Sequence, residues 1–132
     1  MENNFKEKIK MAKIRFATLG YYLLEIEDYC VVFSNNTDWS IILETEPYED
    51  TFQIRIHYKN RLVDKKFYVW MLMEVFQALY GFENSNQSYE GQLDYIAKHK
   101  RHIFEIPPSY IEKYDEMNPI IYNIEKREHH TN

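Results

Sequence analysis

The chain has 132 residues and a formal net charge of −5, and 45% of its residues are hydrophobic and 17% aromatic. This length is typical of one domain, and the composition excludes long-range disorder. The single cysteine, Cys30, excludes an intrachain disulfide, and no segment approaches the ~20 consecutive apolar residues of a membrane helix. Because residues 1–6 also lack the basic-then-apolar order of a signal peptide, we expect a cytoplasmic protein that does not bind a membrane.

The N-terminal region has the pattern of an amphipathic helix over residues 4–19. Its apolar residues recur at the i, i+4, i+7 spacing of one helical face: Phe5, Ile9, Ala12, Phe16 and Leu19. Gly20 can end this helix in a left-handed conformation, because glycine has no Cβ to clash. Lysines and Arg15 cover the rest of the helix, which we interpret as a solvated face.

Residues 22–58 predict an antiparallel meander. The alternation over residues 22–26 is weak evidence for a strand, whereas residues 30–34 and 39–44 are apolar runs separated by a strong turn cluster. Residues 51–58 alternate cleanly, with one side facing a core and the other facing water. Short connections favour antiparallel neighbours. Cys30, inside an apolar run, is interpreted as a packed thiol.

The second half of the chain is predicted to be helical. Residues 59–66 have the composition of a basic loop, and residues 67–80 are apolar on most sides, which predicts a helix on the covered face of the sheet beside the first helix. Ser88 can cap a further helix to about residue 104, and Ser109 with Glu112 has the pattern of a capping box. The apolar residues 120–124 are expected to dock as an edge strand or on a second copy.

The predicted fold class is therefore α+β. An N-terminal helix is followed by a three- to four-stranded antiparallel β-meander and then by two to three helices packed on one face of the sheet. We expect a single domain over residues 1–132, with a frayed tail at residues 125–132.

The charges are arranged in blocks. Residues 21–54 contain eight acidic residues and no Lys or Arg. One interpretation is that loops collect charge and keep the protein soluble. The other is a surface that meets a basic protein, because carboxylates accelerate encounter and aromatics supply contact energy. On that hypothesis the partner-binding residues are Asp38, Trp39, Glu44, Glu46, Tyr48, Glu49 and Asp50. The same acidity argues against direct binding of nucleic acid.

Signatures of enzymes and metal sites are largely missing. There is no GxGxxG, P-loop, GxSxG, HExxH or CxxC motif, so no catalytic residue, metal ligand or cofactor is predicted. His99 and His102 have i, i+3 spacing, but the surrounding Lys98, Lys100 and Arg101 oppose a cation and indicate a solvated basic helix end. A possible ligand site remains on the solvent-facing side of the strand predicted over residues 51–58, formed by Gln53, Arg55 and His57.

The layout of the chain resembles small immunity proteins of bacterial toxin systems. The stretches that carry this resemblance are Leu19-Gly20-Tyr21-Tyr22, Val31-Val32-Phe33 and Ile54-Arg55-Ile56, within an acidic, aromatic-rich chain with one cysteine. The resemblance covers most of the chain in layout but includes no diagnostic motif, so it transfers no site residue. It implies a non-enzymatic protein that binds a toxin.

We therefore expect a protein that neutralises a basic protein partner by steric and electrostatic blockade, as a monomer or a homodimer. One alternative is a virus-encoded inhibitor of a host defence or nucleic-acid enzyme that acts as an acidic mimic of nucleic acid. Another is a small-ligand-binding domain or enzyme that uses Gln53, Arg55 and His57.

Overall fold

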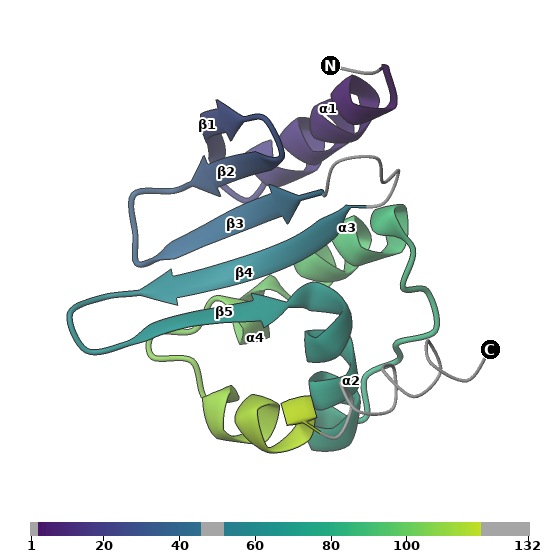
Figure 1. The fold of residues 1–132 in the computed structure, drawn as a ribbon. Coiled ribbons are helices and arrows are strands. Elements are labelled where there is room, and N and C mark those ends of the chain that lie inside the picture. The colour runs from purple at the N-terminus through teal and green to yellow at the C-terminus, as the bar shows by residue number, and fades with distance from the viewer. Residues whose placement is uncertain (1–2, 46–51, 120–132) are drawn as a thin grey trace.

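The structure, a computed structural model, describes residues 3–45 and 52–119. Helices pack on one face of a five-stranded antiparallel sheet with strand order β1-β2-β3-β4-β5 (Figure 1). The elements are α1 (Asn3–Ala17), β1 (Tyr22–Glu27), β2 (Cys30–Ser34), β3 (Trp39–Glu44), β4 (Gln53–Lys59), β5 (Asp64–Tyr68), α2 (Val69–Tyr80), α3 (Tyr89–Lys98) and α4 (Lys100–Ile103). A helical segment over residues 111–119 follows. The predicted α+β class is confirmed, with one strand more than expected.

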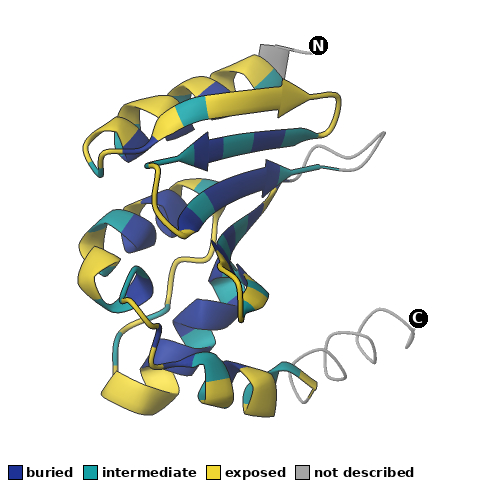
Figure 2. Cartoon of the chain, turned by 90° about the vertical axis from the view of Figure 1, so that its left-hand side faces the viewer, coloured by how far each residue is buried: buried dark blue, intermediate teal, exposed yellow. Residues whose placement is uncertain are grey.

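The core lies between the sheet and the helices. The register places Ile41 opposite Ile56 and Leu43 opposite Ile54, and all four side chains are fully buried. Because side chains alternate between the two faces of a strand, Gln53, Arg55 and His57 lie on the outer face. The predicted alternation of β4 is confirmed, and Figure 2 shows the buried strand residues beside the helical layer.

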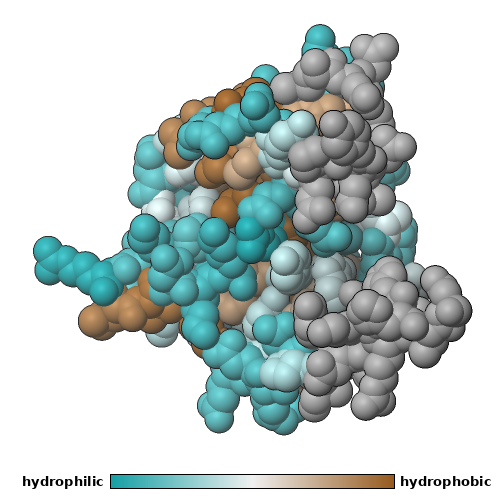
Figure 3. Space-filling view, viewed as in Figure 1, coloured by the Kyte–Doolittle hydropathy of each residue, from teal (hydrophilic) through white to brown (hydrophobic). Residues whose placement is uncertain are grey.

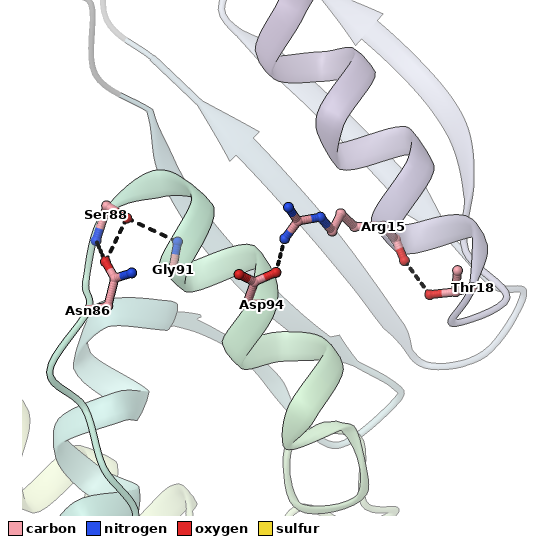
Figure 4. Close-up of polar contacts among 6 residues, drawn as sticks. All are labelled: Arg15, Thr18, Asn86, Ser88, Gly91 and Asp94. Atoms are coloured by element: carbon pink, nitrogen blue, oxygen red, sulfur yellow. Dashed lines mark hydrogen bonds and ion pairs between the residues drawn. The ribbon is translucent and has the colours of Figure 1, made fainter.

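Helix α3 lies between α1 and α2 on the covered face of the sheet (Figure 1). The sequence had placed α2 beside the first helix. Instead, α1 and α3 are joined by the ion pair between Arg15 and Asp94, which Figure 4 shows. The Tyr89 hydroxyl adds a second link, because it donates to the Lys8 carbonyl at 2.6 Å. Helix α2 packs against β4, β5 and α3, in agreement with its almost continuous apolar surface.

The prediction of a loop over residues 59–66 and of a helix starting at residue 67 was wrong, because residues 64–68 form the edge strand β5. Of its five residues only Phe67 is buried, so the strand carries almost no apolar alternation. Part of its outer edge meets the segment 111–119. The Tyr68 backbone N–H donates to the Tyr114 hydroxyl at 2.9 Å, and the Lys65 ammonium lies 3.0 Å from the Asp115 carboxylate.

Two local predictions at helix ends are confirmed. Gly20 has φ +83°, the left-handed conformation expected after the first helix. The Ser88 hydroxyl accepts the Gly91 backbone N–H at 3.0 Å and caps α3, as Figure 4 shows. The helix expected to continue to residue 104 is instead interrupted at His99, which separates α3 from α4.

Candidate partner-binding surface

Four of the residues predicted to bind a partner, Glu46, Tyr48, Glu49 and Asp50, lie outside the described residues. Of the others, Asp38 immediately precedes β3 and Glu44 ends it. A strand rises about 3.3 Å per residue, so these two carboxylates lie about 20 Å apart, at opposite ends of the sheet. Asp38 and Glu44 therefore do not belong to one small contact site.

Trp39 was expected on the contact surface, and the structure corrects this assignment. Its side chain is only 2% exposed and faces the core from the first position of β3. Its ring centroid lies 4.7 Å from that of Tyr58 and 5.5 Å from that of Phe104, and its indole N–H donates to the Glu105 carbonyl at 3.2 Å. A side chain so enclosed supports the fold and offers no surface to a partner.

A different set of acidic residues lies near Glu44. The antiparallel register places Glu27 opposite Cys30 and Cys30 opposite Glu44, so the β1–β2 turn and the end of β3 meet at the same end of the sheet. The Thr45 backbone N–H donates to the Tyr29 carbonyl at 3.0 Å and holds the two segments together. An open hollow of about 630 Å³ lies here, lined by Glu27, Asp28, Tyr29, Cys30, Glu44 and Thr45.

We call Glu25, Glu27, Asp28 and Glu44 the acidic end of the sheet. The pKa of Glu27 is raised, first by a hydrogen bond with Glu25 and then by the charges of Glu25 and Asp28 and by slight burial. Glu44 pairs with Arg55, whereas Tyr29 beside the hollow is 48% exposed. Crowded carboxylates of this kind repel one another, and a cationic group from a partner would relieve the repulsion.

The Cys30 thiol lies at the edge of the same hollow. Burial raises its pKa, and the negative charges of Glu44, Glu27 and Glu25 raise it further. Because the thiolate is the reactive form of cysteine, this environment favours an unreactive thiol, although Cys30 is only half-buried.

The possible ligand trio lies on the outer face of β4, and two of its members already have carboxylate partners. Arg55 pairs with Glu44 and lies over the Tyr68 ring, 5.5 Å from its centroid. The His57 Nε2 atom lies 2.6 Å from an Asp64 carboxylate oxygen, and this contact lowers the pKa of Asp64. Gln53 is exposed. An anionic ligand at Arg55 or His57 would compete with these carboxylates.

The two histidines of the α3–α4 region are part of an aromatic cluster, whereas the neighbouring Lys98, Lys100 and Arg101 are exposed, as expected for a solvated basic helix end. The His99 ring stacks on Phe82 with centroids 4.4 Å apart, and His102 lies 5.1 Å from the same ring. The pKa of His99 is lowered by burial and by the charges of Lys98 and His102. Among residues 3–45 and 52–119, no group of three or more His, Cys, Asp or Glu side chains is placed to hold a metal ion.

Comparison with known proteins adds no relative. No protein-family model matches the chain, and no curated protein and no solved structure matches it. In the described ranges, none of the helices has the length and apolar character needed to cross a membrane. The function must therefore be argued from the site itself.

Three residues of this site, Glu27, Asp28 and Tyr29, were not predicted from the sequence, although both carboxylates belong to the acidic block 21–54. The prediction of these residues would have required the register in which the first three strands pair. A three-stranded antiparallel meander places its first turn beside the end of its third strand, which would have grouped these residues with Glu44.

Proposed function

We propose that this protein is a non-enzymatic binding protein that neutralises a basic protein partner by covering it, with the acidic end of the sheet as a principal contact. The observation that supports the proposal most strongly is the gathering of Glu27, Asp28 and Glu44 around an open hollow beside the exposed ring of Tyr29. Carboxylates steer a basic partner and reject acidic ones, and a tyrosine supplies contact area with little loss of conformational entropy.

The acidic block extends the argument beyond these residues. The carboxylates Glu46, Glu49 and Asp50 follow Glu44 directly in the sequence, and residues 21–54 contain no Lys or Arg. We therefore include these three residues in the proposal on sequence grounds.

The partner class follows from the resemblance to immunity proteins, which implies a bacterial toxin. A host defence or nucleic-acid enzyme, blocked by a mimic of nucleic acid, is the alternative. Both would use the same surface, because each requires carboxylates placed against a basic groove. Identification of the captured partner distinguishes the two.

The proposal is tested by affinity capture from the lysate of the native cell, at low and at moderate salt. The informative variant is Glu27→Lys/Asp28→Lys, since both residues are exposed and reversal leaves the core intact. Its matched control is Glu112→Lys/Glu116→Lys, the same charge change on exposed positions of the segment 111–119.

We expect the wild type and the control to retain one basic protein, weakly at the higher salt, and the informative variant to lose it. Equal retention by the informative and control variants would refute the acidic end as the contact. Retention of no protein at either salt would refute the binding function.

A further inference from the structure

β1 is an edge strand with an unusually apolar surface. Its side chains are exposed almost throughout, including Tyr22 at 43%, Leu24 at 57% and Ile26 at 47% (Figure 2). Figure 3 shows hydrophobic surface gathering over the β1 and β2 region, at the upper left of the outer face. Within the described ranges no strand pairs with the outer edge of β1, whereas the segment 111–119 meets part of the edge of β5. Proteins usually protect such an edge, because its backbone groups can pair with another chain.

A second apolar feature lies on α1. An open hollow of about 400 Å³ is lined by Ile9 and Ile14 and by three lysines, Lys6, Lys10 and Lys13, and Ile14 is 63% exposed. Two other basic side chains of α1 face α3: Arg15 pairs with Asp94, as Figure 4 shows, and the Lys8 ammonium lies 5.3 Å from the centroid of the Tyr89 ring. Successive residues of a helix are rotated by about 100°, so the three lysines lie on the opposite side of α1. That side faces away from α3 and toward the β1 edge of the sheet (Figure 1).

We propose that the free edge of β1 and the hollow on α1 together form a shelf that accepts an extended segment of the partner as a sixth strand. This inference rests on the proposed binding function and adds the mode of recognition. In strand addition, backbone hydrogen bonds give affinity and pockets for alternate side chains give specificity. The ladder between β1 and β2 has a register shift between Leu23 and Glu25, so the edge of β1 that an added strand would pair with regularly is the stretch Glu25–Glu27.

The chemistry of the two faces defines the segment that fits. Glu25 lies opposite Val32 and Glu27 opposite Cys30, so both carboxylates point to the outer face of the sheet. Ile26, between them, points to the helix side. An added strand with Lys or Arg at alternate positions places these cations beside the two glutamates, and its intervening aliphatic side chains lie on the helix side, against Ile26.

The lysines of α1 sharpen this specificity. A slip of one residue turns every side chain of a strand to the other face. In the added strand it would bring the basic residues against Lys6, Lys10 and Lys13 and the aliphatic residues against the glutamates. The two faces of the shelf therefore select the orientation in which the basic side chains point to the outer face of the sheet.

A second copy of the chain fits less well. Pairing of β1 with β1 of another molecule would bring Glu25 and Glu27 of both copies into one short ladder, where like charges face each other with little screening. The positive charge needed to relieve this repulsion has to come from a different chain.

The test uses two synthetic peptides of the same composition, one with Lys and Val in strict alternation and one with the lysines and valines in separate blocks. Binding is measured by calorimetry, and the contact is located by hydrogen exchange. The protein variants are Ile26→Asp and, as a matched control, Ile106→Asp, because the two isoleucines are 47% and 66% exposed and lie in different parts of the molecule.

We expect the alternating peptide to bind at least about tenfold more tightly than the block peptide, and Ile26→Asp to remove most of that advantage. Ile106→Asp should leave it unchanged, and exchange of the β1 amides should slow in the complex. Equal binding of both peptides, or slowed exchange confined to other strands, would overturn the proposal. A dimer in light scattering that Ile26→Asp dissolves would assign the shelf to a second copy and would also overturn the proposal.

The peptide experiment and the capture experiment can fail independently of each other. If the peptides fail while capture of the native partner still depends on Glu27 and Asp28, the shelf is refuted and the binding function stands. If capture fails while the alternating peptide binds with the expected selectivity, the shelf exists and the blockade of a basic protein from the acidic end is refuted.

Discussion

Replacement of Trp39 by Phe tests the reassignment of this residue from the surface to the core. The indole is 2% exposed, packs against Tyr58 and Phe104, and donates a hydrogen bond to the Glu105 carbonyl. Phe retains most of the ring contacts but loses the donor and part of the ring system. The buried apolar part of the indole that Phe lacks is equivalent to about two methylenes, each of which contributes about 0.8 kcal/mol to the free energy of unfolding. Loss of the hydrogen bond adds about 1 kcal/mol.

We therefore expect Trp39→Phe to lower the free energy of unfolding by about 2–3 kcal/mol. The assay is urea denaturation followed by circular dichroism, in which the midpoint should fall while the slope stays constant. Trp70→Phe is the control. Trp70 is only half-buried, so its replacement should cost about 1 kcal/mol or less.

The partner assay completes the test of Trp39. Under conditions where both proteins are folded, Trp39→Phe should bind the partner with wild-type affinity. An unchanged urea midpoint together with a clear loss of affinity would refute the reasoning, because it would place Trp39 at the interface and not in the core.

Three further predictions concern local contacts. Ser88→Ala removes the hydroxyl that accepts the Gly91 N–H, and we expect a loss of about 1 kcal/mol in urea denaturation, with Ser85→Ala, in an exposed loop, near neutral. Gly91→Ala should lower the unfolding free energy by about 1–3 kcal/mol, although Ala favours helices, because its Cβ would collide with the Asn86 carbonyl; a gain in stability would contradict this packing. The hydrogen bond from His57 lowers the pKa of Asp64 below its unfolded value, so this carboxylate stabilises the fold above about pH 4 and the stabilisation is lost as the pH falls through the folded pKa. Asp64→Asn should therefore reduce the acid dependence of the thermal midpoint in that window, and an unchanged dependence would contradict the pairing.

Much of the fold was predictable because the relevant signals are local. The clean alternation of β4 predicts its buried face, and Gly20 predicts the end of the first helix, because each depends on a few neighbouring residues. β5 was missed for a physical reason. An edge strand with one buried residue needs no apolar alternation, so its Asp-Lys-Lys sequence has the composition of a loop.

The candidate site was less predictable because it depends on which segments meet. The acidic character of residues 21–54 was visible in the sequence, but only the register brings Glu27 and Asp28 to the end of β3. Trp39 was misassigned because an aromatic residue next to a turn has the same local pattern whether it faces a core or a partner. Its role depends on Tyr58 and Phe104, which are distant in sequence.

The central claim is that the acidic end of the sheet attracts a basic partner, and the most direct test is the association rate constant of the purified pair as a function of salt. Steering by opposite charges makes this rate fall steeply as ionic strength rises. The account predicts a steep fall for the wild type and for Glu112→Lys/Glu116→Lys, and a much shallower fall for Glu27→Lys/Asp28→Lys. Equal slopes for all three proteins would contradict it.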